Sequence, residues 1–498
     1  MQNLPVNIND TILSKLSHQV AITNKLLLPV KQSDILELFS EYPFFFLENL
    51  CKFYPFSFDE IEKYKYKLNW YWLGSNENID WSKIPFDIFI EMYDQSGAEL
   101  LTICHNKKIP WTIELIEKHI DFWDWTDWGL SHNDALPWSV ELLRKFEDRF
   151  SWHDLSSINL NWTIELLETF DAKWNWGELS YNKYLPWSFE LIQKYQHKFD
   201  FSSLCLNSKV PWDVALIEKY EEKIDWDYLS FNEGLPWDEG LIEKYQDFLN
   251  WKNLSQNPKL PWSETFIVKY FESWDWDILS INPALPWSID FIKKYLNKWN
   301  FKKISQNTGL PWNEVLIDAF IDRWGWSNTI QNDSDAELYD EYQRKGLCLN
   351  ESIPWDINLI AKYSKFIDWS CLKHNSAFKW SVGKINVLKD RIEWGGFNLG
   401  KNVWLDAFND IMNKEIVDKI LNEIDYLFGE SIDCEGFNLH GISLKNGYSY
   451  ISYENIPGFL VKFEDLYLGK NDPENCLDTI QSVNLYPLQL QIIKNKEK

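Results

Sequence analysis

The sequence predicts an all-α fold: a helical-repeat solenoid of about thirteen two-helix units, with an N-terminal helical cap and a small β-rich (α+β) module at the C-terminal end. Two observations lead to this prediction. A proline followed by an aromatic residue recurs along the chain, and every step from Trp162 to Trp312 is 25 residues. The chain also contains 30 Trp, far above ordinary usage, and 45% hydrophobic residues, which argues against disorder.

The predicted organisation has three parts. Residues 1–55 form the helical cap, with apolar helices near 35–39 and 44–53 that cover the first repeat. Residues 56–404 form the Trp-rich solenoid, and residues 405–498 form a C-terminal α+β module or cap. Position one of a unit is the aromatic residue that in most units follows a proline. These anchors are Phe56, Phe86, Trp111, Trp138, Trp162, Trp187, Trp212, Trp237, Trp262, Trp287, Trp312, Trp355 and Trp380, with Trp404 as a further candidate.

Each unit begins with a helix whose start is marked at position two. That residue is Ser, Thr, Asp or Asn, the types that cap a helix N-terminus. Trp287 and Ile292 then have the spacing of a hydrophobic staple around the Ser288 cap. Positions five, six, nine and thirteen are apolar and share one face. We predict solvated i,i+4 ion pairs on the opposite face: Glu114 with Lys118, Glu141 with Lys145, and Glu190 with Lys194.

A short second helix follows, capped by Asp or Asn at position fourteen. Position nineteen is small, usually Ser, so Cys104, Cys205 and Cys348 in this slot are predicted to fill space and not to act as nucleophiles. Position twenty-one is Asn, which tolerates a left-handed helix end and can hydrogen-bond exposed loop backbone, and we predict an asparagine ladder there. Its members are Asn76, Asn106, Asn182, Asn207, Asn232, Asn257, Asn282, Asn307, Asn332 and Asn375, with Asn133 and Asn159 nearby.

The step from Trp312 to Trp355 is 43 residues, which is 25 plus 18. A degenerate unit near 333–350 fits this interval, with a helix that begins at residues 335–338 and ends in register at residues 347–350. Such a unit is either a hinge or a degenerate copy without function.

After Trp404 the pattern changes. Residues 405–427 have the apolar spacing of one or two amphipathic helices, whereas residues 429–469 alternate apolar and polar side chains. Turns are predicted at Asn446-Gly447 and Pro457-Gly458.

Composition limits the classes of function. The net charge of −26 disfavours binding to nucleic-acid phosphates and suits a basic partner. The seven Cys have no paired spacing typical of zinc sites or disulfide frameworks, so a reducing cytoplasm is predicted. We find no apolar run long enough for a membrane span and no signal peptide, so no membrane association is expected.

The sequence contains no phosphate-binding loop, metalloprotease motif, EF-hand loop or nucleophile elbow. A non-enzymatic protein without cofactor or metal is therefore favoured, although residues that meet only in space leave an enzyme open. His440 with Cys434 and Glu435 could supply a nucleophile and its base if the fold joins them. A metal site at Glu454, Glu464, Asp465, Asp472 and Glu474 competes with a solvated acidic face. His105, His132 and His374 are expected in loops near position twenty.

Positions that vary between units are the candidates for partner binding, because the constant positions are needed for packing. Position sixteen varies, and position twenty varies most among large side chains. The alternative is that position twenty packs against the loop of the next unit. The predicted partner-binding residues at position twenty are Tyr181, Leu206, Phe231, Gln256, Ile281 and Gln306.

Over residues 56–404 the repeat resembles short Trp-rich tandem helical repeats of uncharacterised bacterial proteins, a resemblance that implies no named function. The units are too short for tetratricopeptide repeats and lack the ankyrin Thr-Pro-Leu-His sequence. We expect a scaffold that binds a protein or peptide. Two alternatives remain: a recognition arm for a toxin, effector or immunity activity in residues 405–498, and an acidic inhibitor of a basic toxin or nucleic-acid-binding protein.

Overall fold

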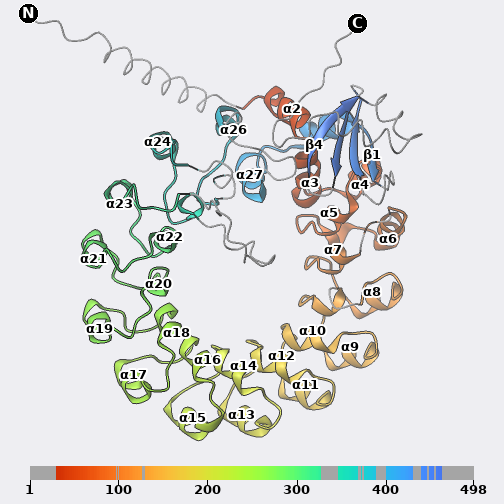
Figure 1. The fold of residues 1–498 in the computed structure, drawn as a ribbon. Coiled ribbons are helices and arrows are strands. Elements are labelled where there is room, and N and C mark those ends of the chain that lie inside the picture. The colour runs from red at the N-terminus through yellow and green to blue at the C-terminus, as the bar shows by residue number, and fades with distance from the viewer. Residues whose placement is uncertain are drawn as a thin grey trace, which may run out of the picture. The chain divides into compact units, whose positions relative to one another are not determined.

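The computed structural model describes residues 30–96, 98, 100–125, 129–326, 346–367, 372, 375–388, 400–429, 439–445, 448–453 and 456–462. This part of the chain is mostly helical, with regularly spaced consecutive helices that contact their neighbours (Figure 1). The helical character of the predicted fold class is thereby confirmed. The chain divides into two compact units: unit 1 comprises Met1–Gly97 and Asp368–Lys498, and unit 2 comprises Ala98–Ile367.

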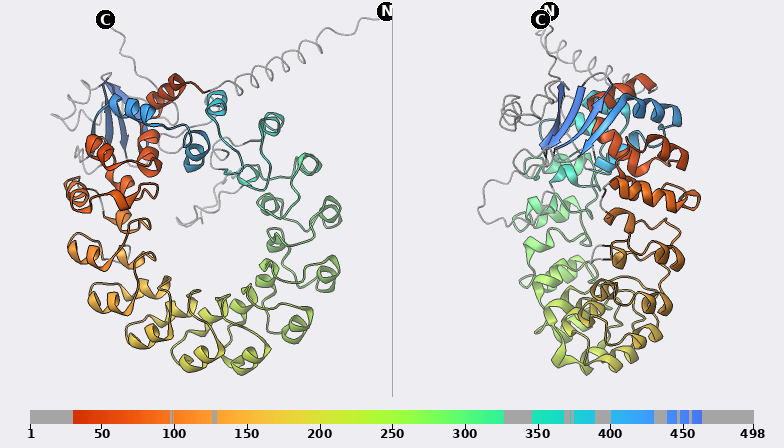
Figure 2. Two further views of the ribbon diagram at one scale, coloured as in Figure 1. Left: turned by 180° about the vertical axis from the view of Figure 1, so that it is seen from behind. Right: turned by 90° about the vertical axis from the view of Figure 1, so that its right-hand side faces the viewer.

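Unit 2 contains two rows of short helices, and the row of second helices lies on the inner side of its bend (Figures 1 and 2). The first helices are α8 (Ile113–Lys118), α9 (Val140–Lys145), α11 (Ile164–Thr169), α13 (Phe189–Tyr195), α15 (Val214–Lys219), α17 (Glu239–Tyr245), α19 (Glu264–Lys269), α21 (Ile289–Lys294), α23 (Glu314–Ala319) and α24 (Ile357–Lys362). The second helices are α7 (Leu101–Cys104), η2 (Leu130–His132), α10 (Trp152–Ser157), α12 (Trp176–Tyr181), α14 (Phe201–Leu206), α16 (Trp226–Phe231), α18 (Trp251–Gln256), α20 (Trp276–Leu279), α22 (Phe301–Ile304) and η5 (Leu347–Leu349). A one-turn η3 (Glu221–Lys223) follows α15.

The predicted caps are present at both helices of a unit. The Ser288 hydroxyl accepts a hydrogen bond from the Phe291 backbone N–H at the start of α21. The Asp275 carboxylate does the same for Ile278 at the start of α20. Trp287 precedes the Ser288 cap and is only 8% exposed. Its burial supports the prediction that the anchor tryptophans are structural.

A row of buried Asn side chains joins consecutive units. Asn257 Nδ2 donates to the carbonyl oxygens of Ser230 (3.2 Å) and Asn232 (3.1 Å) in the preceding unit, and its Oδ1 accepts from the Lys259 N–H. The ladder is confirmed, but its predicted conformation is wrong, because Asn257 has φ −70° and bonds buried carbonyls. An extended residue here directs its amide at the neighbouring unit. Equivalent bonds are made by Asn182, Asn207, Asn232, Asn282 and Asn307.

Asn159 does not belong to this ladder. The step from Trp138 to Trp162 is 24 residues, so Ile158 takes position twenty-one and its carbonyl accepts from Asn182 Nδ2 at 3.0 Å. Asn159 is half-buried, and its side chain accepts only from the nearby Asn161 N–H. A shift of one residue is therefore enough to remove an Asn from the row.

Lysines at position eight bridge the first helices of consecutive units. Lys145 Nζ lies 2.6 Å from Glu117 Oε2 of the preceding unit. Neither Lys145 nor Lys194 forms the predicted ion pair with the Glu four residues earlier, among the described helices. The reason is visible at Glu190, whose carboxylate accepts hydrogen bonds from its own N–H and from the cap hydroxyl, contacts that lower its pKa. Further bridges join Lys194 to Glu168, Lys244 to Glu218, Lys269 to Glu239 and Glu243, Lys294 to Glu264, and Lys362 to Glu314 and Asp318.

The described residues on either side of the 43-residue step continue the Asn ladder from one rung to the next. Asn350 Nδ2 donates to the carbonyls of Ser305 (2.9 Å) and Asn307 (3.1 Å), so Asn350 takes the rung next to Asn307. The predicted end of the unit at residues 347–350 is thus in register, but it completes the unit that begins at Trp312. The predicted helix start and Asn332 fall in residues 327–345, outside the described residues.

Unit 1 brings together helices from both of its chain segments. Its helices are α2 (Gln32–Glu41), α3 (Pro43–Phe53), α4 (Phe58–Tyr64), α5 (Trp70–Gly74), η1 (Trp81–Lys83), α6 (Phe86–Gln95), α26 (Val382–Leu388), α27 (Gly400–Ala407) and α28 (Lys414–Glu423). The predicted cap helices α2 and α3 are present, and α3 contacts α5. The α3 rings also pack against residues far along the chain: Phe46 lies 4.9 Å from Phe408, and Phe45 lies 5.8 Å from Trp404, between ring centroids.

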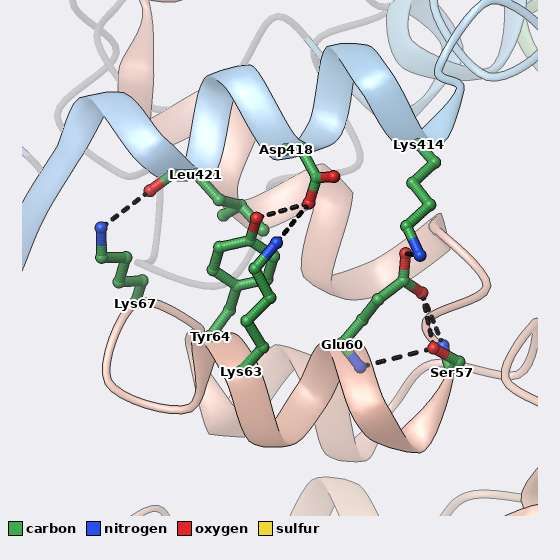
Figure 3. Close-up of polar contacts among 8 residues, drawn as sticks. All are labelled: Ser57, Glu60, Lys63, Tyr64, Lys67, Lys414, Asp418 and Leu421. Carbon is green, nitrogen blue, oxygen red and sulfur yellow. Dashed lines mark hydrogen bonds and ion pairs between the residues drawn. The ribbon is translucent and has the colours of Figure 1, made fainter.

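Polar contacts continue this packing between α4 and α28 (Figure 3). The buried Tyr64 donates its hydroxyl to Asp418 Oδ1, and Lys63 Nζ lies 3.1 Å from the same oxygen. Lys67 Nζ donates to the Leu421 carbonyl at 3.1 Å, near the C-terminus of α28, where a cation is stabilised by the helix dipole. We call the contacts of Lys63, Tyr64 and Lys67 with α28 the end clasp.

Four strands follow α28 in unit 1 and pair antiparallel in the order β1-β2-β3-β4. They are β1 (Ile424–Gly429), β2 (Leu439–Leu444), β3 (Tyr448–Tyr453) and β4 (Ile456–Lys462). Pro457-Gly458 therefore lies inside β4, and the predicted turn there is wrong. Among the described strands β4 is at the edge, where a proline costs no ladder hydrogen bond on its open side. Asn446-Gly447 falls between β2 and β3, outside the described residues.

Candidate protein-binding surface

The six predicted partner-binding residues lie at the ends of consecutive second helices. Tyr181, Phe231 and Gln256 close α12, α16 and α18, and their side chains are exposed. The other three are half-buried: Leu206 closes α14, Ile281 follows α20, and Gln306 follows α22. We call these six side chains the position-twenty strip.

The strip is continuous because the second helices pack side by side. Contacts join α12 to α14, α14 to α16, α16 to α18 and α18 to α20 (Figure 1). On α16, Leu229 and Ser230 are fully buried, whereas the next residue, Phe231, is 40% exposed. Positions eighteen and nineteen are therefore buried in the core, whereas the side chain at position twenty is exposed to solvent. The alternative was that position twenty packs against a neighbouring loop. Only the half-buried members of the strip, Leu206, Ile281 and Gln306, are compatible with it.

Tyr228 extends the strip and was not among the predicted residues. Its side chain is 43% exposed and lies three residues before Phe231 on α16. Residues three apart share one helix face, so the two exposed rings lie on the same side of α16. The helical spacing from position seventeen to position twenty could have indicated Tyr228, but position seventeen is polar in most neighbouring units.

Position sixteen serves partly in packing between units. Asp227 accepts a hydrogen bond from Asn250 Nδ2 at 2.7 Å. Asp277 accepts from Asn300 and pairs with Lys303, and this ammonium is the main cause of the lowered pKa of Asp277. These polar bonds tie adjacent second helices together. Position sixteen is therefore a weaker candidate for recognition than position twenty.

Two histidines occupy the equivalent region of the earlier units. The His105 and His132 rings lie 6.0 Å apart between centroids, in edge-to-face geometry. Burial lowers the pKa of His105, and the neighbouring His132 lowers it further, while Asp124 acts in the opposite direction. A lowered pKa favours the neutral imidazole near pH 7. His374 lies outside the described residues.

The cysteines at position nineteen are poor nucleophiles. Burial raises the pKa of both Cys104 and Cys205 to about 12. A thiol with such a pKa stays protonated near neutral pH, whereas the thiolate is the reactive form. Their predicted space-filling role is supported.

The other candidate sites lie largely outside the described residues. His440 is in β2 and pairs in register with Ser452, but Cys434 and Glu435 are not described. The five acidic residues of the predicted metal alternative are also outside. In the part of the chain that the structure covers, no group of three or more His, Cys, Asp and Glu side chains is placed to hold a metal ion. No helix among the described elements has the length and apolarity needed to cross a membrane.

The surface thus consists of exposed side chains on a regular framework that buries its constant residues. Comparisons with family models, with curated proteins and with solved structures give no match for this chain.

Proposed function

We propose that the protein is a non-enzymatic repeat scaffold that binds a protein or peptide along the position-twenty strip. The observation that carries this proposal is the exposure of Tyr181 on α12 and of Tyr228 and Phe231 on α16, two helices that both pack against α14. Exposed aromatic rings bury large apolar area on binding, and Tyr is among the residues that most often dominate interface energies.

The variation along the strip supports a recognition role. Most units keep the same caps, Asn rungs and buried rings, but position twenty changes from Tyr to Leu, Phe, Gln and Ile. Solenoids commonly bind partners through such extended rows of variable side chains. The anchor tryptophans are less suited to this role, since most are buried, as Trp212 and Trp237 are at 3% and 8% exposure.

The proposal also includes the architecture of the chain and its location in the cell. The helices form one solenoid of about thirteen two-helix units, and the sheet of β1 to β4 is the core of a C-terminal α+β module. The protein acts in the cytoplasm, and its Trp-rich repeats are of a bacterial kind.

The test is comparative affinity purification of the full chain. A double variant, Tyr181→Glu with Phe231→Glu, places two charges on the strip. Val268→Glu is the matched control, because Val268 is 53% exposed on a first helix, away from the strip. We expect proteins that co-purify with the unmodified chain to be lost with the double variant and retained with the control.

The proposal fails if the double variant keeps every partner at unchanged yield. Circular dichroism and the thermal midpoint must match the unmodified chain in both variants, so that loss of binding reports the strip and not unfolding. Substitutions at exposed positions usually change stability by less than about 0.5 kcal/mol.

A further inference from the structure

A second exposed apolar row lies on the first helices of unit 2. Ile164, Phe189 and Val214 are 42%, 40% and 41% exposed, at position three of three consecutive units. Ile113 and Val140 hold the same position in the two preceding units and are half-buried. Five neighbouring helices, α8, α9, α11, α13 and α15, therefore begin with an apolar side chain.

The fold itself does not require apolar residues at position three. In three later units the same position is Glu239, Glu264 and Glu314, and each carboxylate pairs with a Lys of the next unit, whereas Ile289 and Ile357 hold it in the other two. At Phe189 the corresponding Lys219 lies with Nζ 4.1 Å from the ring centroid. A polar or an apolar residue is thus accommodated equally well, and the exposed apolar row calls for another explanation.

Acidic side chains run beside this row at position four: Glu114, Glu141, Glu165 and Glu190. All four are exposed, and none forms an ion pair with any other described residue. The pKa values of Glu114 and Glu190 are lowered, mainly by a hydrogen bond from the residue's own backbone N–H and then by the cap hydroxyl. The lowered pKa keeps the Glu114 and Glu190 carboxylates charged at neutral pH, and Lys145 adds to the effect at Glu114 without forming an ion pair with it.

The spacing of the row matches an α-helix. Packed helices lie about 8 to 10 Å apart, so five units place their position-three side chains along roughly 40 Å. Seven residues of an α-helix rise about 10 Å, close to one unit. An apolar residue in every heptad of a docked helix would thus meet one member of the row per unit.

We propose that this apolar-acidic face, formed by Ile113, Val140, Ile164, Phe189 and Val214 with the four glutamates, binds a basic amphipathic helical segment of another protein. The apolar side of the segment covers the row, and its Lys or Arg side chains pair with the glutamates. Charge complementarity selects the basic partner, and an acidic helix is repelled. This face is distinct from the position-twenty strip, so the inference does not rest on the proposed function.

The probe is a labelled synthetic Leu/Lys amphipathic peptide of about four heptads, which matches the length of the row. Its binding to the full chain is followed by fluorescence anisotropy. Two matched peptides replace all Lys by Glu or all Leu by Ser. We expect at least about tenfold weaker binding for each, because one loses charge complementarity and the other loses apolar burial.

Two variants of the chain test the location. A triple variant, Ile164→Ser, Phe189→Ser and Val214→Ser, removes the exposed apolar row. A quadruple variant replaces the four glutamates by Gln. Each is expected to weaken the Leu/Lys peptide about tenfold. If the triple variant does not fold, Phe189→Ala alone replaces it, with about threefold weakening expected.

A control variant changes the net charge by the same amount as the quadruple variant, but at the other ends of the first helices. It carries Asp148→Asn, Glu222→Gln, Asp247→Asn and Glu272→Gln, all exposed and outside the face. The control should bind the peptide as the unmodified chain does. Equal weakening by the control, no effect of the apolar substitutions, or no binding of the Leu/Lys peptide would each overturn the proposal.

Discussion

Unit 2 and unit 1 are stabilised by contacts of very different range along the chain. In unit 2, Asn257 bonds carbonyls 25 and 27 residues earlier, and Asn207, Asn232, Asn282 and Asn307 repeat this with their preceding units. In unit 1, the end clasp joins residues 354 or 355 positions apart. The comparison separates two tasks: unit 2 adds stability one neighbour at a time, whereas unit 1 joins chain segments that have no proximity in sequence.

This difference has a kinetic side. Short-range contacts form quickly because little chain entropy is lost before each is made. Joining ends separated by several hundred residues costs more, although the cost grows only with the logarithm of the separation. We expect unit 2 to fold unit by unit and the end clasp to form last. The clasp should also be the first region to open in native-state hydrogen exchange.

The largest effect is expected from Trp287→Ala in unit 2. Trp287 is 8% exposed, packs against Phe291 and Trp299, and donates its indole N–H to the Asn282 carbonyl at 2.9 Å. Its removal should lower the free energy of unfolding by about 3 to 5 kcal/mol, measured by urea denaturation. Hydrogen exchange should speed up in the adjoining units only. A uniform increase that includes α28 would break the proposed distinction between the two units.

Asn257→Ala tests one rung of the ladder. Two carbonyls and the Lys259 N–H lose their partner, so we expect a loss of about 2 to 3 kcal/mol. Asn159→Ala is the matched control, since Asn159 is outside the ladder, and it should cost less than about 0.5 kcal/mol. Similar losses of unfolding free energy for the two variants would show that the buried hydrogen bonds of Asn257 contribute little to stability.

A smaller, non-local effect is expected at the end clasp. Tyr64→Phe removes the donor and Asp418→Ala removes the acceptor of this hydrogen bond, and a double-mutant cycle should give a coupling energy of about 1 to 2 kcal/mol. Exchange should increase in α4 and α28 together while the Asn rungs of unit 2 keep their protection. Additive single effects would mean that the bond is not made in solution.

The stability of the end clasp should also depend on pH. The direction of this dependence follows from the pKa shifts of Asp418 and Tyr64. The Tyr64 hydroxyl lowers the pKa of Asp418 below its usual range, with help from Lys63. Stability from the carboxylate is therefore complete above about pH 4, the usual Asp pKa, and is lost as the pH falls through the lowered value. Burial and Asp418 raise the pKa of Tyr64, so its contribution is lost only above about pH 10. Hydrogen-exchange protection of α4 should therefore decrease at acidic pH in the unmodified chain. In Asp418→Asn this decrease should be absent.

The smallest effect on stability is expected at the position-twenty strip. Phe231→Ala removes an exposed ring at 40% exposure and should change the free energy of unfolding by less than about 0.5 kcal/mol. Binding of any partner that uses the strip should nevertheless weaken. A stability loss comparable to that of Asn257→Ala would show that Phe231 belongs to the core.

The helical repeat was predictable because its determinants are local. A Ser at position two caps the helix that follows it whatever surrounds it, as Ser288 does. The recurrence of Asn at position twenty-one likewise indicated a shared hydrogen-bonding role. The direction of those bonds was not predictable. Only adjacent units in space reveal that Asn257 reaches carbonyls of the preceding unit, or that Lys145 prefers Glu117 to its own helix.

The end clasp and the candidate site show two further limits. Nothing in the local pattern of Tyr64 or Asp418 indicates that they meet, since both look like ordinary helix-surface residues. The position-twenty strip could be named from its variation, but Tyr228 required the exposed face of α16. Likewise, only the hydrogen bonds of Asn350 show that it takes the rung next to Asn307, 43 residues earlier in the chain.

The end clasp also bears on how the gene can change. Tandem repeats gain and lose copies readily by unequal recombination, and an open solenoid tolerates this because each unit contacts only its neighbours. Here the segments before and after the array, with Tyr64 on one and Asp418 on the other, belong to one compact unit. A duplicated copy would lengthen the stretch of chain between Tyr64 and Asp418, which contact each other within unit 1. We expect copy number to be held constant while the exposed residues of each copy remain free to diverge.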